Sequence, residues 1–479
     1  MPCRSMFWQR VIYGCINYFS HNVIVLLDMK STQPNERSGV AEKISAVHNH
    51  AKPEAAHHRF TRPLRTTLIG VGGFGQTHRT VIRQLEEQNL LRLTDVVDPS
   101  PETSPETYNL LRNQGVRWNR SWEEFESMGE TPDCVFIAAP IHLHADYARQ
   151  AVRTGARVYL EKPPVPLLGQ MEELMAWEAG GPQIQVGFTF PYSTQMRTLR
   201  QWIESGRLGK IESYRLSLCW PRGDQYYQRA RWAGRLWLDD KPVLDGPATN
   251  ALAHRIHDLL TIEAYACGEV TMPAELWAEM YRARPIETYD ICCARGVFPS
   301  GAEFGITLSH ACAVERELAF EIRGSRGWAR LCGPDLALTS SFISETITSE
   351  EEPIVAAFRH FVECARTGAA PLVGLAETRP YVAMTNAMFI SSQGIHSIDS
   401  RHVQEVESPT GRIYDVDEIN NLSAKAFQTG LNFSELDADW GVPGKLVQPD
   451  ELSSLEIHEW FRRLSQQNQK GTHASEHSV

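Results

Sequence analysis

Two side chains in this sequence are well placed for acid–base chemistry, Lys162 and His254. Either could take the proton of a hydroxyl group. Histidine titrates near neutrality, whereas lysine has an ordinary pKa of about 10.4, which burial or a neighbouring positive charge must lower before it can act there. The plain alternatives are a surface lysine paired with Glu161 and a histidine that only packs a helix.

A glycine-rich turn precedes both residues. The segment LRTTLIGVGGFG (64–75) reads as a β-strand that runs into a G-x-G-x-x-G motif and then into a helix. The first glycine allows the turn, the second lets the backbone approach a pyrophosphate, and the third lets the helix pack on the strand. An ordinary glycine-rich turn is the alternative. The candidate dinucleotide contacts in this motif are Gly70, Gly72, Gly73, Phe74 and Gly75.

An acidic residue, Asp98, closes the second predicted strand. A carboxylate at this position can accept hydrogen bonds from both ribose hydroxyls and would repel a 2′-phosphate. The sequence therefore favours NAD over NADP, although arginines such as Arg79 could reach a phosphate.

Short β–α units continue through the first part of the chain. Apolar runs such as CVFIAAP (134–140) predict the buried strands of a parallel sheet. Repeated units of this length predict a doubly wound Rossmann domain, in which ligands bind at the carboxyl ends of the strands. The segments AAPIHLH and EKPP follow two such ends, and they add Ala139, Pro140, His144, Glu161 and Lys162 to the candidate cofactor-binding residues.

Taken in order, these motifs resemble those of the Gfo/Idh/MocA oxidoreductases, the family of glucose–fructose oxidoreductase and inositol dehydrogenase. The family pattern has a histidine in the first helix, a Pro-x-x-x-His segment, a Glu-Lys-Pro strand end and a later Asp-x-x-x-His pair. The resemblance covers about residues 64–394. The matching residues are Gly75 and His78, Pro140 and His144, Glu161, Lys162 and Pro163, and Asn250 with His254.

The resemblance implies an α/β fold, with an N-terminal Rossmann domain and a C-terminal α+β domain that has a large, mostly antiparallel sheet. It also implies hydride transfer between NAD or NADP and a hydroxyl of a sugar, polyol or related compound. One alternative is a tightly bound NAD used transiently in glycoside cleavage or epimerisation. Another is an NAD-binding sensor without turnover.

One position departs from the family pattern. Asn250 stands where many dehydrogenase members have an aspartate. Asparagine cannot be a base but can hydrogen-bond a substrate hydroxyl, so we expect Asn250 and His254 to bind substrate, and the substitution puts the proton-relay role of that position in doubt. His257 replaces the usual later acid. Asp258 follows His254 at helical spacing, but no third ligand is evident and we expect no metal.

The second domain begins near residue 188 and contains an insertion rich in tryptophan, tyrosine and arginine. Aromatic faces suit a sugar ring and arginines suit carboxylates or hydroxyls, so Trp232 is a candidate substrate contact. A lid or a subunit contact is an equally good interpretation. Strands are expected at about 271–282, 288–298, 302–313, 317–323 and 327–332. Few helices are left for the second face of this sheet, so we expect it to pack on another subunit in a homodimer or homotetramer.

The composition is that of a globular protein, with 479 residues, 42% hydrophobic and 22% charged. The net charge of −11 argues against general nucleic-acid binding. The 10 cysteines form no CxxC pair, which favours reduced thiols and a cytoplasmic location. The longest clean apolar run near the N-terminus is far shorter than the ~20 residues that span a membrane. We expect a flexible leader (1–62), a Rossmann domain (63–187), a substrate and oligomerisation domain (188–400) and a C-terminal extension (401–479).

Overall fold

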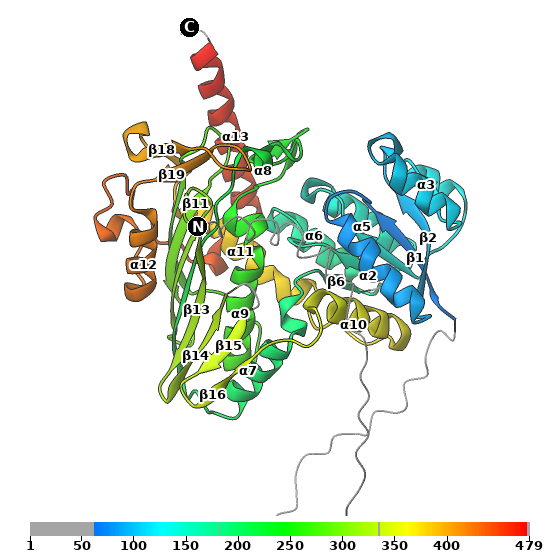
Figure 1. The fold of residues 1–479 in the computed structure, drawn as a ribbon, viewed down its shortest axis with the longest axis horizontal. Coiled ribbons are helices and arrows are strands. Elements are labelled where there is room, and N and C mark those ends of the chain that lie inside the picture. The colour runs from blue at the N-terminus through cyan, green and yellow to red at the C-terminus, as the bar shows by residue number, and fades with distance from the viewer. Residues whose placement is uncertain (1–61, 182, 334–335, 477–479) are drawn as a thin grey trace, which may run out of the picture. The chain divides into compact units, whose positions relative to one another are not determined.

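The computed structural model describes residues 62–181, 183–333 and 336–476, all of which belong to one compact unit (Figure 1). The expected leader lies outside the described residues except for Arg62. Two sheets organise the chain. No helix in the described part of the chain is long and apolar enough to cross a membrane.

The first sheet is the predicted Rossmann sheet. Its six strands are all parallel and lie in the order β3-β2-β1-β4-β5-β6. The central strand β4 is apolar and fully buried, as helices on both faces of a parallel sheet require. The strands are β1 (Leu64–Ile69), β2 (Leu91–Val97), β3 (Arg117–Asn119), β4 (Cys134–Ile137), β5 (Arg157–Leu160) and β6 (Ile184–Val186), and the helices are α2 (Gly75–Glu87), α3 (Pro105–Asn113), α4 (Trp122–Ser127), α5 (His144–Arg153) and α6 (Leu168–Glu178).

The second sheet has nine strands in the order β16-β15-β14-β13-β7-β12-β11-β10-β17. Its pairs are antiparallel except for β7 with β12 and β10 with β17, which confirms the mostly antiparallel sheet. The strands are β7 (Ile211–Cys219), β10 (Glu275–Arg282), β11 (Ile291–Val297), β12 (Glu303–Ser309), β13 (Arg316–Gly324), β14 (Gly327–Cys332), β15 (Ala337–Ser340), β16 (Ile343–Ile347) and β17 (His396–Ser397).

One face of this sheet is covered by the helices α7 (Thr194–Glu204), α9 (Ala253–Cys267) and α11 (Leu375–Ser391) (Figure 1). Just before α9 lies a single π-helical turn, η4 (Pro247–Ala251). The aromatic insertion between β7 and η4 holds the short helix α8 (Asp224–Gln228) and the strand pair β8 (Trp237–Leu238) and β9 (Lys241–Pro242).

The other face of the sheet is covered by the chain's own C-terminal extension. A shortage of helices to cover this face is therefore not a valid reason to expect a subunit contact. The C-terminal extension folds back on this face through the helix α12 (Ile419–Thr429), which packs against β7 and β12 (Figure 1). The approach is so close that a Cβ on Gly305 would lie 2.9 Å from the Cα of Gly430. Leu422 and Phe433 are buried here against Cys219 of β7. The extension also forms the hairpin of β18 (Val403–Val406) and β19 (Ile413–Val416). No clear helical pattern marks α12 in the sequence, because its buried stripe is short.

Two further helices join the two halves of the unit. The helix α10 (Pro353–Thr367) follows the second sheet but packs on the Rossmann domain, where Phe358 lies 4.8 Å from Phe136 between ring centroids. The helix α13 (Ser454–Glu476) contacts α6 and α11, and Phe461 is fully buried there against Phe389. Residues 455–464 have an amphipathic pattern in the sequence, and the structure shows its apolar residues Ile457, Phe461 and Leu464 buried against the same chain.

Candidate active site

The glycine turn has the shape that a dinucleotide needs. Gly70 has a φ of +82°, and a Cβ there would lie 2.9 Å from the carbonyl oxygen of Ala138. A Cβ on Gly75 would collide with the carbonyl oxygen of Gly70, so α2 can begin only at a glycine. A Cβ on Gly72 would meet nothing within 4 Å. The space above Gly72 is therefore free for a pyrophosphate at the N-terminus of α2, where the helix dipole favours negative charge.

The carboxylate of Asp98 lies beside this turn. Its Oδ2 accepts a hydrogen bond from the amide of Val71 at 3.0 Å, and its Oδ1 accepts one from the amide of Ser100 at 3.0 Å. The side chain is half-buried, so each oxygen keeps a lone pair for another donor. These contacts hold the carboxylate where a ribose would follow the pyrophosphate, and they fit the adenosine end of NAD.

His144, which we expected to contact the cofactor, is held between two loops of the protein. Its Nδ1 lies 2.9 Å from the carbonyl oxygen of Pro163, its Nε2 lies 2.8 Å from that of Ala139, and only 2% of its surface is exposed. No ring nitrogen is left for a ligand. His144 therefore joins the loops after β4 and β5 and positions Ala139 and Pro140 at the edge of the sheet.

Glu161 is likewise committed to the protein. Its Oε1 lies 2.8 Å from Nε2 of His78 on α2, and its Oε2 accepts the backbone amide of Lys162 at 3.0 Å. The side chains of His78 and Glu161 are both buried. No ion pair joins Glu161 to the Lys162 ammonium in the structure, so the alternative of a surface lysine paired with Glu161 is wrong. The Glu161–His78 pair fixes the strand end from which Lys162 projects.

Lys162 reaches the second domain. Its Nζ donates a hydrogen bond of 3.0 Å to the carbonyl oxygen of Asn250 in η4, and the side chain is half-buried. Burial lowers the pKa of Lys162 below its ordinary value, and this outweighs the opposing effect of the carboxylates of Glu161 and Asp245. The amine therefore loses its proton more readily than a surface lysine does.

His254 stands in the first turn of α9, close enough to Lys162 for the two charges to interact. The pKa of His254 lies well below its ordinary value, because the ring is buried and because Lys162 and Arg255 are nearby. Its ring packs edge-on against Phe188 at 5.6 Å. The lowered pKa favours the neutral imidazole of His254, which can donate or accept a hydrogen bond.

A carboxylate that the sequence analysis overlooked stands behind Asn250. The Asn250 Nδ2 donates to Oδ1 of Asp245 at 2.7 Å, and only 3% of Asp245 is exposed. The Oδ2 of Asp245 accepts the amide of Gly234 at 2.7 Å and lies 4.0 Å from the guanidinium of Arg229. Burial raises the pKa of Asp245. The signal was present in the sequence as an acid five residues before Asn250.

Trp232 joins this network at its far end. The guanidinium carbon of Arg229 lies 4.6 Å from the ring centroid of Trp232. The structure thus places Lys162, Asn250 and His254 close together, with Arg229 of the insertion next to them. His144 and Glu161 instead bind the backbone of the loop that carries Lys162.

His257 and Asp258 lie elsewhere on α9. The His257 ring stacks on Phe188 at 4.1 Å, and burial lowers its pKa to about 3. Asp258 pairs with Arg255 at 3.0 Å, so it is not free to share a metal with His254. Among the described residues, no group of three or more histidine, cysteine, aspartate or glutamate side chains could hold a metal ion.

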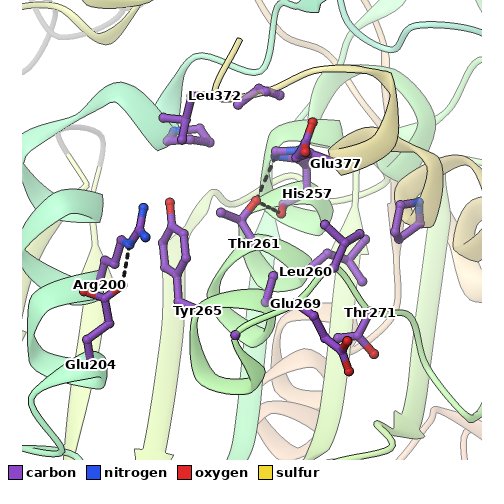
Figure 2. Close-up of a pocket in the computed structure, with 16 residues that line it drawn as sticks. Arg200, Glu204, His257, Leu260, Thr261, Tyr265, Glu269, Thr271, Leu372 and Glu377 are labelled. Carbon is purple, nitrogen blue, oxygen red and sulfur yellow. Dashed lines mark hydrogen bonds and ion pairs between the residues drawn. The ribbon is translucent and has the colours of Figure 1, made fainter. Parts of the chain in front are cut away.

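A separate cavity of about 280 Å³ borders α7, α9 and α11 (Figure 2). His257 lines it, and the Thr261 hydroxyl donates to the carbonyl oxygen of His257 at 2.8 Å and lies 3.3 Å from its Nδ1. Arg200 pairs with Glu204 across from them. Lys162, Asn250 and His254 are not among its lining residues. The cavity is therefore distinct from the neighbourhood of Lys162.

Known protein families match both sheets. A model described as "oxidoreductase family, NAD-binding Rossmann fold" matches residues 64–188, and a GFO/IDH/MocA C-terminal domain model matches residues 196–330. These two matches take in more than half of the chain. The chain belongs to the Gfo/Idh/MocA oxidoreductase family.

Curated members of this family are similar over different lengths. Inositol 2-dehydrogenase from Ralstonia nicotianae is 31% identical over 154 residues, which are 30% of this chain and 43% of the relative. Inositol 2-dehydrogenase from Burkholderia cenocepacia is 24% identical over 324 residues, which are 64% of this chain and 87% of the relative. The chain thus spans less than half of the length of some curated relatives that it matches.

Solved structures of the family share the fold. The WlbA dehydrogenase from Bordetella pertussis, in complex with NADH and UDP-GlcNAcA, aligns with a TM-score of 0.59 and 22% identity over 69% of this chain and 97% of its own. Levoglucosan dehydrogenase in complex with NADH aligns with a TM-score of 0.59 and 17% identity over 69% and 97% of the two chains. At such identities, the likeness shows the two-domain architecture.

Proposed function

We propose that this Gfo/Idh/MocA member transfers a hydride between NAD and the hydroxyl-bearing carbon of a sugar, polyol or related compound. The observation that carries the proposal is the half-buried amine of Lys162, which projects from a Rossmann strand end to Asn250 with its pKa lowered. Relatives named as sugar and polyol dehydrogenases support the substrate class. Bound NAD would supply the hydride acceptor.

In this proposal Lys162 accepts the proton of the substrate hydroxyl. The carbonyl oxygen of Asn250 orients the amine, since it already accepts a hydrogen bond from Nζ. After proton transfer the new ammonium keeps that bond, and the carboxylate of Asp245 favours its positive charge. His254, as a neutral imidazole, hydrogen-bonds the same hydroxyl and fixes the reacting carbon.

Replacing Lys162 by alanine tests the proposal. Single-turnover hydride transfer should fall about 100- to 10,000-fold, the usual cost of losing a general base. Binding of NADH should change only a few fold, because the glycine turn and Asp98 lie away from Nζ. Replacing His254 by alanine should cut turnover and also weaken substrate binding more than the lysine variant does. Hydride transfer by Lys162→Ala at nearly the starting rate would show that the assignment is wrong.

Two assays separate the other readings. Reduction of added NAD by a panel of sugars and polyols identifies a dehydrogenase. Products formed without added NAD would instead identify a glycoside hydrolase or epimerase with transient redox chemistry, and binding of NADH with neither activity would identify a sensor. We also propose a cytoplasmic homodimer or homotetramer. Light scattering at micromolar concentration tests the assembly, and a monomer would contradict it.

A further inference from the structure

Arginine and aromatic side chains stack on one another where β7 and β12 end. This cluster, called the wall below, consists of Trp220, Arg222, Tyr226, Arg229 and Trp232. These strands are parallel neighbours, so their carboxyl ends share one edge of the sheet. The amide of Trp220 donates to the carbonyl oxygen of Ser309 at 2.8 Å, and Nδ1 of His310 lies 3.0 Å from the carbonyl oxygen of Trp220. Trp220 packs against the same core as α9. The wall therefore rises on the face of the sheet that carries the proposed active site.

Two guanidinium groups stack in this wall. The Cζ of Arg222 lies 3.5 Å from the ring centroid of Trp220 and 4.4 Å from that of Tyr226. The Cζ of Arg229 lies 3.6 Å from the centroid of Tyr226 and 4.6 Å from that of Trp232. Stacking holds a guanidinium by its face and leaves its N–H groups, which lie in the plane, for other acceptors.

The wall is connected to the proposed base. Arg229 lies 4.0 Å from Asp245, Asp245 accepts a hydrogen bond from Asn250, and Asn250 accepts one from Lys162. The positive charge of Arg229 is near enough to help lower the pKa of Lys162. A molecule whose hydroxyl faces Lys162 would therefore extend toward the arginines.

The charge of Arg222 is not neutralised within the described residues. Arg284 shows the contrast, since it is largely buried and its guanidinium pairs with the carboxylate of Asp224. Arg222 forms no hydrogen bond or ion pair through its guanidinium with any described residue, and its Nε is buried without a partner. Glu315 acts on it only from beyond ion-pair distance. His310 adds no charge, because burial and the two arginines hold its pKa well below the ordinary value.

We propose that Arg222, with Arg229 beside it, binds an anionic group of the sugar substrate, a carboxylate or a phosphate, away from the reacting hydroxyl. This inference rests on the proposed function for the identity of the substrate. The planar fork of a guanidinium matches the paired oxygens of such groups. An anion would also supply the partner that a half-buried cation otherwise lacks.

Matched pairs of compounds test this inference. Glucuronate is compared with glucose, gluconate with glucitol, and glucose 6-phosphate with glucose, by kcat/KM for NAD reduction. At least one anionic member should exceed its neutral partner by about 10-fold or more, and whether the carboxylate or the phosphate series does so identifies the group. Neutral compounds preferred in all pairs would overturn the inference.

Variants locate the effect. Arg222→Gln should lower kcat/KM for the anionic member by about 10- to 100-fold, mostly through KM, and leave the neutral member within about threefold. Arg222→Lys keeps the charge but loses the planar guanidinium fork, so its kcat/KM for the anionic member should lie between those of the starting protein and Arg222→Gln. Arg231→Gln is the matched control, because Arg231 lies in the same insertion, is exposed and pairs with Asp239 at 3.1 Å. Equal losses on anionic and neutral members would show a purely structural role and overturn the inference.

Binding to the NADH complex gives a readout without turnover. Calorimetric titration of the same pairs should show tighter binding of the anionic member, and Arg222→Gln should remove that difference. If the difference is present but no compound is ever oxidised, the anion site stands and the proposed hydride transfer fails. If no anionic compound binds more tightly than its neutral partner, the anion site is wrong whatever the activity.

Discussion

Asp98 should set the choice between the two nicotinamide cofactors, and the structure indicates which substitution tests it cleanly. Alanine would remove the acceptor of the Val71 and Ser100 amides, which lie 3.0 Å from the carboxylate oxygens. The glycine turn would then lose its support together with the ribose contact. Asparagine keeps the size of the side chain and one acceptor oxygen, although its Nδ2 would face the other backbone amide as a donor. Asp98→Asn therefore keeps more of the support than alanine does, and it separates recognition from support better.

The size of the effect follows from the bonds at stake. A hydrogen bond to a charged group contributes about 1.5–3 kcal/mol. If Asp98→Asn weakens two bonds from ribose hydroxyls, the Kd for NADH should rise about 10- to 100-fold, at about 1.4 kcal/mol for each factor of ten. The affinity for NADPH should change little or improve, because a negative charge facing the 2′-phosphate is gone. Asp98→Ala should in addition lower the free energy of unfolding by about 1–3 kcal/mol, since backbone amides lose their acceptor.

The assay is fluorescence titration of NADH and NADPH against the starting protein, Asp98→Asn and Asp98→Ala, with thermal unfolding alongside. Glu102→Gln is the control, because this exposed acid follows the same strand but pairs with Arg120. The reasoning is refuted if the starting protein binds both cofactors equally, or if Asp98→Asn weakens both by the same factor.

Four further outcomes are expected. The rate of alcohol oxidation should rise with pH to a plateau, and the midpoint of this rise should lie below the ordinary lysine pKa of about 10.4. The rise should be absent in Lys162→Ala, and a pH-independent rate in the starting protein would contradict the assignment. The free energy of unfolding should decline as pH falls from about 6.5 toward 3, because His257 is protonated in the unfolded state but stays neutral in the folded state over this range. Urea titrations should show a smaller decline for His257→Phe. Phe461→Ala should lower the free energy of unfolding by about 3–5 kcal/mol in the same assay, and an unchanged value would contradict a stabilising role of α13. Asn250→Asp should depress turnover, because a second carboxylate would stand where the amide now lies 2.7 Å from Asp245; undiminished turnover would contradict this.

The parts that the sequence predicted well are those written in local patterns. The sequence pattern predicts helices at 375–391 and 144–153, and α11 and α5 have these bounds, because apolar periodicity and glycine ends are local signals. A serine directly before the apolar-periodic segment at 122–128 predicts an N-cap, and the Oγ of Ser121 does accept the amide of Glu124 at 3.2 Å at the start of α4. The segment VYLEKPPV predicts a strand at 158–165, but the observed β5 stops at Leu160, since two prolines follow and cannot donate to a ladder.

The parts that the sequence could not predict depend on contacts between distant segments. Nothing local distinguishes a histidine that binds a cofactor from His144, whose two ring nitrogens meet carbonyl oxygens of separate loops. The cover of the second sheet by α12 depends on a glycine-to-glycine approach between residues more than a hundred positions apart. A count of helices in the central domain therefore underestimated what the extension supplies.

The pairing of Asn250 with Asp245 gives the departure from the family pattern a physical meaning. An asparagine at the position of the usual aspartate looks at first like the loss of a proton relay. The structure places a buried carboxylate 2.7 Å from that amide, and two carboxylates at this separation could not both be ionised. The amide at 250 and the acid at 245 are thus compatible as a pair, and a carboxylate remains close enough to Lys162 to favour its charged form. The site therefore keeps a negative charge near its base while presenting a neutral hydrogen-bonding group beside it, which is an arrangement suited to binding a hydroxyl and returning its proton.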